Sequence, residues 1–391
     1  MSADDTPKGT GTRLVHVGRA PRPLARTVNA PIQGGSTVLF ESGYDPYRDD
    51  LGPTYGRMGL EPHRTLEAAL CDLENAAGVT LTPSGLSACT LALSAVLSAG
   101  DHLLLTDSVY GPTRSFCLET LKRYGVDTTL FPPRATPAEL EARRQPNTKA
   151  VFLESPGSLT FELNDLQGVA AWARTHSIYT LADNTWGAGL LCKPIDLGID
   201  LSIQALTKYV IGTSAAMAGS VAARTEALAE LVYWEARRSG LNTAPEAVHA
   251  AQTGLRSLHA RLPRHAATAQ NLVDWLKTRE EVETVLWPAD PDSPDHALWK
   301  RDFTGCCGLF GFTLKPVSLD AQKRFFAGFN VFGHGYSWGG FESLILPCDP
   351  QLKRAGGRPF GRAPLVRVHA GLEDAEDLIA DLDAAFGRLA A

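Results

Sequence analysis

The chain has 391 residues, of which 44% are hydrophobic and 20% are charged. This length allows two domains and a large core, and the composition is ordinary for a soluble globular protein. The net charge of −6 argues against a nucleic acid or an anionic membrane as a partner. The seven cysteines form an odd set without a Cys-x-x-Cys pair, which predicts free thiols in a reducing cytosol rather than disulfides or a metal site.

The first 60 residues are rich in glycine, proline and charged positions and show little periodicity. We expect them to form an extended arm whose first dozen residues are disordered. They contain no basic segment followed by an apolar one, so we expect a cytoplasmic protein without a targeting signal. The apolar run at 88–99 is too short to span a bilayer and predicts a buried helix.

Strands and helices are predicted to alternate from residue 61 to residue 255. Strands are expected at 102–106, 128–131 and 150–153 and from Ile178 and Leu201, and helices at 113–124, 137–143 and 166–175. This order predicts an α/β fold with a mainly parallel sheet and helices on both faces. Strands at 307–314 and 365–369 and a helix at 373–389 predict a smaller α+β domain over 256–391.

Two polar residues follow predicted strands that are close in the sequence. Asp183 ends the strand that begins at Ile178, and Lys208 follows the strand that begins at Leu201. The carboxyl ends of parallel strands meet at one edge of a sheet, where ligands bind. An aspartate and a lysine in one crevice suit pyridoxal phosphate (PLP), although residues of this kind at strand ends are more often solvated.

A phosphate site is predicted before the apolar helix. Ser84 and Gly85 precede it, and free backbone N–H groups at a helix N-terminus bind phosphate, although the same residues also form plain helix caps. No Gly-x-Gly-x-x-Gly motif follows a predicted strand, so a nicotinamide or flavin site is not supported.

Eight short motifs follow one another along the chain. They are Tyr55-Gly56-Arg57, Pro83-Ser84-Gly85, Asp107-Ser108-Val109-Tyr110, Phe152-Leu153-Glu154-Ser155-Pro156-Gly157-Ser158, Asp183-Asn184-Thr185-Trp186, Thr207-Lys208-Tyr209, Tyr336-Ser337-Trp338-Gly339-Gly340-Phe341-Glu342-Ser343 and Arg367-Val368-His369-Ala370-Gly371-Leu372-Glu373. In this order they resemble the PLP-dependent enzymes of Cys/Met metabolism, and within that family most of all the bacterial cystathionine β-lyases. The resemblance implies the aminotransferase-like fold (fold type I), with a PLP-binding domain at 61–255, a C-terminal domain at 256–391 and an arm at 1–60 that contacts a neighbouring subunit.

The resemblance also implies a role for each matching residue. Lys208 matches the lysine that forms the Schiff base with PLP and then moves protons, and burial or nearby cations should lower its pKa. Asp183 matches the partner of the pyridine nitrogen. Tyr110 matches the tyrosine that stacks on the ring; without the resemblance it would be an ordinary aromatic of the core.

The phosphate and the substrate have their own matching residues. Gly85, Leu86 and Thr207 match the phosphate donors, and Tyr55 and Arg57 match residues that reach the phosphate of the neighbouring subunit. This implies a homodimer with shared sites, which the family usually pairs into tetramers.

Arg367 matches the arginine that binds the substrate α-carboxylate, with Ser337, Trp338 and Tyr55 beside the substrate. A lone arginine on a strand is more often a surface residue, but the apolar neighbours of Arg367 favour burial with an anion.

Four places in the chain depart from common family patterns. Ala205 stands where many relatives have a serine that binds the phosphate, a replacement shared by the bacterial β-lyases. Thr213-Ser214-Ala215 replaces a common His-Ser-Asp segment. Ser158 and the segment Ser337-Trp338-Gly339 favour a β-lyase over the γ-enzymes.

The resemblance predicts a small-molecule substrate and a place in methionine biosynthesis. The expected reaction is β-elimination of L-cystathionine to homocysteine, pyruvate and ammonia. The alternatives are another C–S lyase, a γ-lyase or a γ-synthase of the same family, and a non-catalytic binding or regulatory protein with the same fold.

Overall fold

A computed structural model describes residues 8–18, 27–40 and 52–389. Seven strands form the larger sheet in the order β1-β7-β6-β5-β4-β2-β3. Their bounds are Gly78–Thr82 (β1), His102–Thr106 (β2), Asp127–Phe131 (β3), Thr148–Glu154 (β4), Tyr179–Asp183 (β5), Leu201–Gln204 (β6) and Gly219–Ala223 (β7). Strands β3, β2, β4, β5 and β6 run parallel, and β7 runs antiparallel to both of its neighbours. The predicted mainly parallel sheet is therefore confirmed.

A second sheet is antiparallel throughout and has the order β10-β11-β9-β8. Its strands are Val282–Leu286 (β8), Leu309–Leu314 (β9), Leu344–Pro347 (β10) and Leu365–His369 (β11). Two of them, β9 and β11, correspond to strands expected from the sequence.

Helices cover the sheets. Their bounds are Thr10–His16 (α1), Glu61–Glu74 (α2), Gly85–Val96 (α3), Gly111–Ser115 (α4), Pro137–Glu141 (α5), Leu166–Thr175 (α6), Glu226–Arg238 (α7), Pro245–Leu276 (α8), His296–Asp302 (α9), Leu319–Phe326 (α10) and Ala375–Gly387 (α11), with short 3-10 helices at Gly56–Met58 (η1) and Asp349–Gln351 (η3) and a π-helix at Phe116–Leu121 (η2). Alternate residues of β2 show that both faces of the larger sheet are covered. Leu103 and Leu105 belong to the apolar cluster that includes α3, whereas Leu104 belongs to the one that includes α6.

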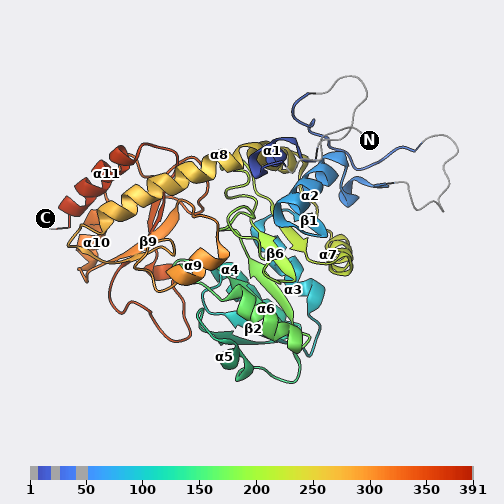
Figure 1. The fold of residues 1–391 in the computed structure, drawn as a ribbon, viewed down its shortest axis with the longest axis horizontal. Coiled ribbons are helices and arrows are strands. Elements are labelled where there is room, and N and C mark those ends of the chain that lie inside the picture. The colour runs from blue at the N-terminus through green and yellow to red at the C-terminus, as the bar shows by residue number, and fades with distance from the viewer. Residues whose placement is uncertain (1–7, 19–26, 41–51, 390–391) are drawn as a thin grey trace.

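One long helix runs beside both sheets (Figure 1). Helix α8 contacts α1 and α2 at one end and α11 at the other, so the predicted domain boundary between residues 255 and 256 falls inside a continuous helix. Arg261 of α8 donates hydrogen bonds to the carbonyl groups of Tyr209 (2.7 Å) and Val210 (3.3 Å). Helix α8 therefore fixes the segment directly after Lys208.

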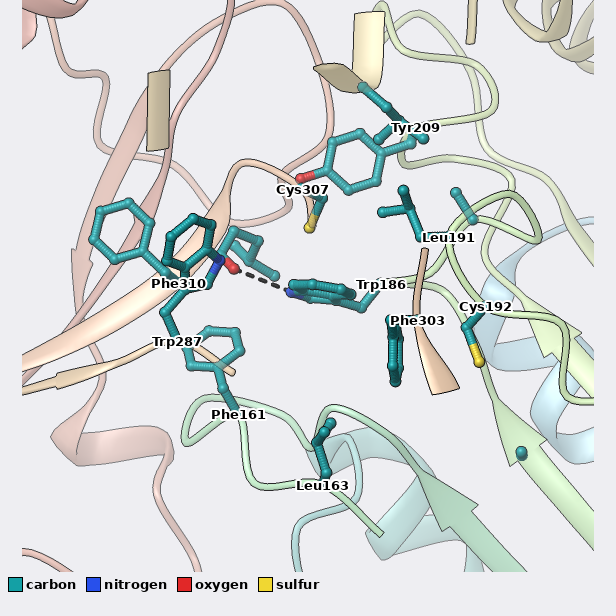
Figure 2. Close-up of a cluster of buried hydrophobic side chains, with 14 of the residues drawn as sticks. Phe161, Leu163, Trp186, Leu191, Cys192, Tyr209, Trp287, Phe303, Cys307 and Phe310 are labelled. Atoms are coloured by element: carbon teal, nitrogen blue, oxygen red, sulfur yellow. Dashed lines mark hydrogen bonds between the residues drawn. The ribbon is translucent and has the colours of Figure 1, made fainter. Parts of the chain in front are cut away.

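A single apolar cluster joins the two sheets (Figure 2). Trp186, which follows β5, donates a hydrogen bond of 3.0 Å to the carbonyl of Leu309 at the start of β9. The Trp186 ring also packs edge-on against Phe303, with 5.6 Å between ring centroids. Because the side chains between the sheets form one core, each sheet holds the other in place.

The N-terminal expectation is partly wrong. Residues 10–12, within the dozen expected to be disordered, form the start of α1, because Leu14 is buried and Arg256 donates to the carbonyl groups of Leu14 and Val17. Residues 1–7 lie outside the described residues. Residues 27–40 form no helix or strand and make one isolated bridge, between Thr37 and Tyr55.

All seven cysteines are free, as predicted, and of the neighbours Cys306 and Cys307 the first is half-buried and the second is buried. Across the described ranges, no helix is both long and apolar enough to cross a membrane.

Candidate active site

The strand ends bring the predicted residues together. Asp183 is the last residue of β5 and pairs in register with Ile203 of β6. Lys208 is the fourth residue after the end of β6. Burial raises the pKa of Asp183 and lowers the pKa of Lys208, and the charge of each residue opposes the shift of the other. The two side chains therefore lie close enough for their charges to interact, as the sequence predicts.

The hydrogen bonds of Asp183 favour its charged form. Its Oδ1 accepts from the backbone N–H of Thr185 at 3.0 Å and from the Thr185 hydroxyl at 2.5 Å. Its Oδ2 accepts from the Cys89 thiol at 3.6 Å. Burial raises the pKa of Asp183, and these donors and Lys208 oppose that rise. An anionic aspartate held in this way suits a protonated pyridine nitrogen.

Lys208 contacts the segment that contains Ser337 and Trp338. Its Nζ donates to Ser337 Oγ at 2.6 Å and lies 5.2 Å from the centre of the Trp338 ring. Burial, followed by the charge of Arg367, lowers the pKa of Lys208 to about 8. A substantial fraction of the amine is therefore neutral near physiological pH, which both imine formation and proton abstraction require.

Ser337, which accepts the hydrogen bond from Lys208, has a strained backbone. Its φ is 81°, in the left-handed region that non-glycine residues rarely adopt. In this conformation the Ser337 hydroxyl meets Lys208, and the Ser337 carbonyl accepts from Arg367 at 2.9 Å. The next glycine, Gly339, has a φ of 86° and lies so near the backbone of Lys208 that a Cβ would come within 3.0 Å.

Arg367 is a buried cation without an anion. It lies on β11 with 8% of its surface exposed, and within residues 8–18, 27–40 and 52–389 the one hydrogen bond of its guanidinium is to the Ser337 carbonyl. Burial lowers its pKa. The predicted burial is confirmed, whereas the described chain supplies no anionic partner. Since a buried charge is costly unless it is paired, the geometry suits an anion from outside, such as a substrate carboxylate.

The N-terminus of α3 forms the candidate phosphate site. Ser84 caps the helix by accepting from the Ser87 N–H at 3.2 Å, and the N–H groups of Gly85 and Leu86 lie in the first turn, where a helix offers no acceptor. A Cβ on Gly85 would come within 2.4 Å of the Ala205 Cβ, so only glycine allows this close approach.

Thr207 and Tyr110 are the other two residues predicted to bind the cofactor within this chain. The Thr207 hydroxyl is hydrogen-bonded to the backbone of Ala218, donating to its carbonyl at 3.0 Å. Tyr110 is 45% exposed, which leaves its ring face available, and its backbone N–H donates to Glu154 at 2.6 Å. Burial and the nearby Glu154 raise the pKa of the Tyr110 hydroxyl, so it remains protonated at neutral pH.

Tyr55 and Arg57 do not join these residues within one chain. The Arg57 guanidinium donates to the Arg237 carbonyl at the end of α7 at 2.7 Å, and Arg237 donates back to the Arg57 carbonyl at 2.7 Å. Tyr55 is 47% exposed, and together with the exposed Val28 and Leu39 it leaves apolar surface uncovered on the arm.

The residues present fit PLP. The crevice offers an anion for the ring nitrogen (Asp183), an amine for the aldehyde (Lys208), and backbone donors for the phosphate (Gly85 and Leu86). Arg367 stays free for a substrate carboxylate. This set of groups matches the chemistry of PLP-dependent reactions of amino acids.

The lowered pKa of Lys208 predicts how the protein without cofactor captures PLP. Only the neutral amine reacts with an aldehyde, so the capture rate should rise with pH and level off above about 8, rather than near the ordinary lysine value of 10.5. Stopped-flow absorbance after mixing with PLP measures this midpoint. Because Arg367 contributes to the lowering, Arg367→Leu should move the midpoint upward. A wild-type midpoint near the ordinary lysine value would contradict the assignment.

The sequence interpretation assigned no role to two residues that hold the site. Thr185 supplies two hydrogen bonds to Asp183, and Glu154 accepts from the Tyr110 N–H and shares a hydrogen bond with the Ser158 hydroxyl. The rule that identified Asp183 could also have identified Glu154, because it ends the neighbouring strand in the same way.

Comparisons with known proteins show which family and which enzymes the chain is similar to. The family described as "Cys/Met metabolism PLP-dependent enzyme" matches this chain over residues 11–387. Cystathionine β-lyase MetC of Escherichia coli is 40% identical, over 98% of this chain and 99% of its own length. Cystathionine β-lyase of Salmonella typhimurium is also 40% identical, over 98% and 100%. A crystal structure of cystathionine γ-synthase from Xanthomonas oryzae pv. oryzae in complex with cystathionine superposes with a TM-score of 0.91 at 31% identity, covering 98% and 99%.

Proposed function

Because the chain belongs to the PLP-dependent enzymes of Cys/Met metabolism, we propose that it is a β-lyase that cleaves L-cystathionine. With one water, the products are homocysteine, pyruvate and ammonia, and the homocysteine would serve methionine synthesis. The observation that carries the proposal is the position of Lys208, a lysine of lowered pKa close to the charges of both Asp183 and Arg367. The similarity to cystathionine β-lyases over nearly the whole chain favours this reaction within the family.

The chain's own groups divide the work. PLP, when bound, supplies an electron sink for the charge that develops at the substrate Cα. Arg367 holds the α-carboxylate, and Asp183 keeps the ring nitrogen protonated. Lys208 removes the Cα proton, and Lys208 or the protonated Tyr110 hydroxyl delivers a proton to the sulfur that leaves Cβ.

Identification of the keto acid tests the reaction. L-cystathionine should yield pyruvate, and L-cystine should show whether other cysteine derivatives are also substrates. 2-Oxobutyrate from L-cystathionine or L-methionine would mark a γ-lyase instead. Bound cofactor without turnover of any of the three would mark a non-catalytic protein and contradict the proposal.

We further propose a homodimer with shared sites, paired into a tetramer, in the cytoplasm, where seven free thiols persist best. Arg57 would deliver its guanidinium to the phosphate of the neighbouring subunit, where planar bidentate binding suits phosphate oxygens. The position of Arg57 in its own chain supports this proposal, because its guanidinium donates a hydrogen bond to α7 and is not bonded to the residues around Lys208. The exposed apolar residues of the arm also fit burial against a second copy.

Mixing two inactive variants tests the sharing. Arg57→Ala and Lys208→Ala chains should form heterodimers in which one site carries both defects and the other carries neither. Activity should therefore return to about a quarter of the wild-type level if chains exchange at random and each intact site is fully active. Subunit exchange, followed by native mass spectrometry, without any return of activity would contradict the shared site.

A further inference from the structure

Two carboxyl groups end neighbouring strands at the centre of the site. Glu154 is the last residue of β4 and Asp183 the last of β5, and the two are direct partners in the parallel register. Register partners in a sheet point to the same face, and neighbouring strands lie about 4.8 Å apart. The negative charge of Asp183 accordingly raises the pKa of Glu154.

The charged groups around this pair favour ionisation of Asp183 over ionisation of Glu154. Lys208 faces Asp183 and stabilises its negative charge. Arg354, in the loop before β11, is the cation that acts on Glu154, but its guanidinium is already paired with Glu162 at 2.7 Å. The other titratable groups beside Glu154 are the Tyr110 hydroxyl and the Cys89 thiol, whose raised pKa values keep both neutral.

The hydrogen bonds of Glu154 fit an un-ionised acid. Its Oε2 accepts from the Tyr110 N–H at 2.6 Å, and its Oε1 lies 2.7 Å from the Ser158 hydroxyl. A hydroxyl can accept as well as donate, so a protonated Oε1 would donate to Ser158 and leave both oxygens satisfied. Asp183, in contrast, accepts from three donors, which favours its charged form.

We propose that Glu154 works as a neutral carboxylic acid, which holds Tyr110 and Ser158 in place and leaves Asp183 as the charged member of the pair, available to the ring nitrogen of the cofactor. Glu154 is thus a positioning residue. Burial, and then the charge of Asp183, raise its pKa well above the usual value, in agreement with this role. The inference rests on the proposed role of Asp183 at the ring nitrogen, but not on which thioether the enzyme cleaves.

Infrared spectroscopy of the holoenzyme tests the protonation state. At pH about 9, the wild type should show the carbonyl band of an un-ionised carboxylic acid, shifted in heavy water and absent from Glu154→Gln. The alkaline pH matters because Glu74, another buried acid, has a pKa raised to about 7 and would be mostly ionised there. If the two spectra are the same, Glu154 is a carboxylate and the proposal is overturned.

The dissociation constant for PLP tests whether Glu154 acts through its hydrogen bonds and not through a negative charge. In Glu154→Gln an amide can accept from Tyr110 and donate to Ser158, so the dissociation constant for PLP should rise by no more than about threefold. Glu154→Ala leaves the Tyr110 N–H without its acceptor and should weaken binding by about tenfold or more.

The same carboxyl-to-amide change at the partner, Asp183→Asn, is the matched control. It should alter the pH dependence of the absorbance of the bound cofactor, because the negative charge beside the ring nitrogen is lost, whereas Glu154→Gln should preserve that dependence. If Glu154→Gln alters it as much as Asp183→Asn, the proposal is wrong. None of these measurements depends on pyruvate, so a failure of the proposed reaction and a failure of this inference are distinguishable.

Discussion

Lys208→Ala is expected to lower turnover of L-cystathionine by at least about 10³-fold, because one change removes both the amine that binds the cofactor and the base that moves the Cα proton. The side chain also makes the 2.6 Å hydrogen bond to the strained Ser337, so the loop beside Arg367 loses a contact. Steady-state pyruvate formation, with the cofactor content of each preparation measured by absorbance, gives the effect.

An exposed lysine provides the control for this variant. Lys122→Ala removes the same side chain from the surface after η2 and should leave turnover within about twofold of the wild type. Thermal unfolding should show that both variants are folded. Retention of a tenth of wild-type activity by Lys208→Ala would exclude Lys208 as the essential base.

Asp183→Asn is expected to lower turnover by about 10² to 10³-fold while it weakens cofactor binding far less. The amide can still accept a hydrogen bond from Thr185, so the local structure is preserved, but the ring nitrogen loses its charge partner. Turnover and the PLP dissociation constant, measured on the same preparation, separate the two effects.

Asp127→Asn is the matched control for Asp183→Asn. It makes the same change at the first residue of β3, whereas Asp183 is the last residue of β5. It should retain wild-type turnover. Near-normal turnover of Asp183→Asn with bound cofactor would show that another group carries the role assigned to Asp183.

The sequence predicted most accurately the strands that are buried on both faces. Continuous apolar runs identified β2 and the centre of β4, because strands covered by helices on two sides need no alternation. Strand β7 was not predicted. It reads Gly-Ser-Val-Ala-Ala and owes its conformation to antiparallel pairing with β1 and β6, which no local pattern reveals.

The candidate site was predictable where it follows from topology. The carboxyl ends of β5 and β6 had to meet, which placed Asp183 and Lys208 together. The left-handed backbone of Ser337 was not predictable, because serine has no preference for that conformation and the surrounding loop imposes it. The role of Arg57 depends on a second chain, so neither its sequence context nor its own subunit determines it.

Borohydride reduction of the wild-type holoenzyme, followed by peptide mapping, tests the central claim most directly. Reduction fixes PLP covalently to the lysine that holds it, and mass spectrometry then identifies that residue. The account predicts a single modified peptide that carries the label on Lys208, at the carboxyl end of the strand beside Asp183. A label on any other lysine, or an unmodified Lys208 in a protein that retains the reduced cofactor, would contradict it.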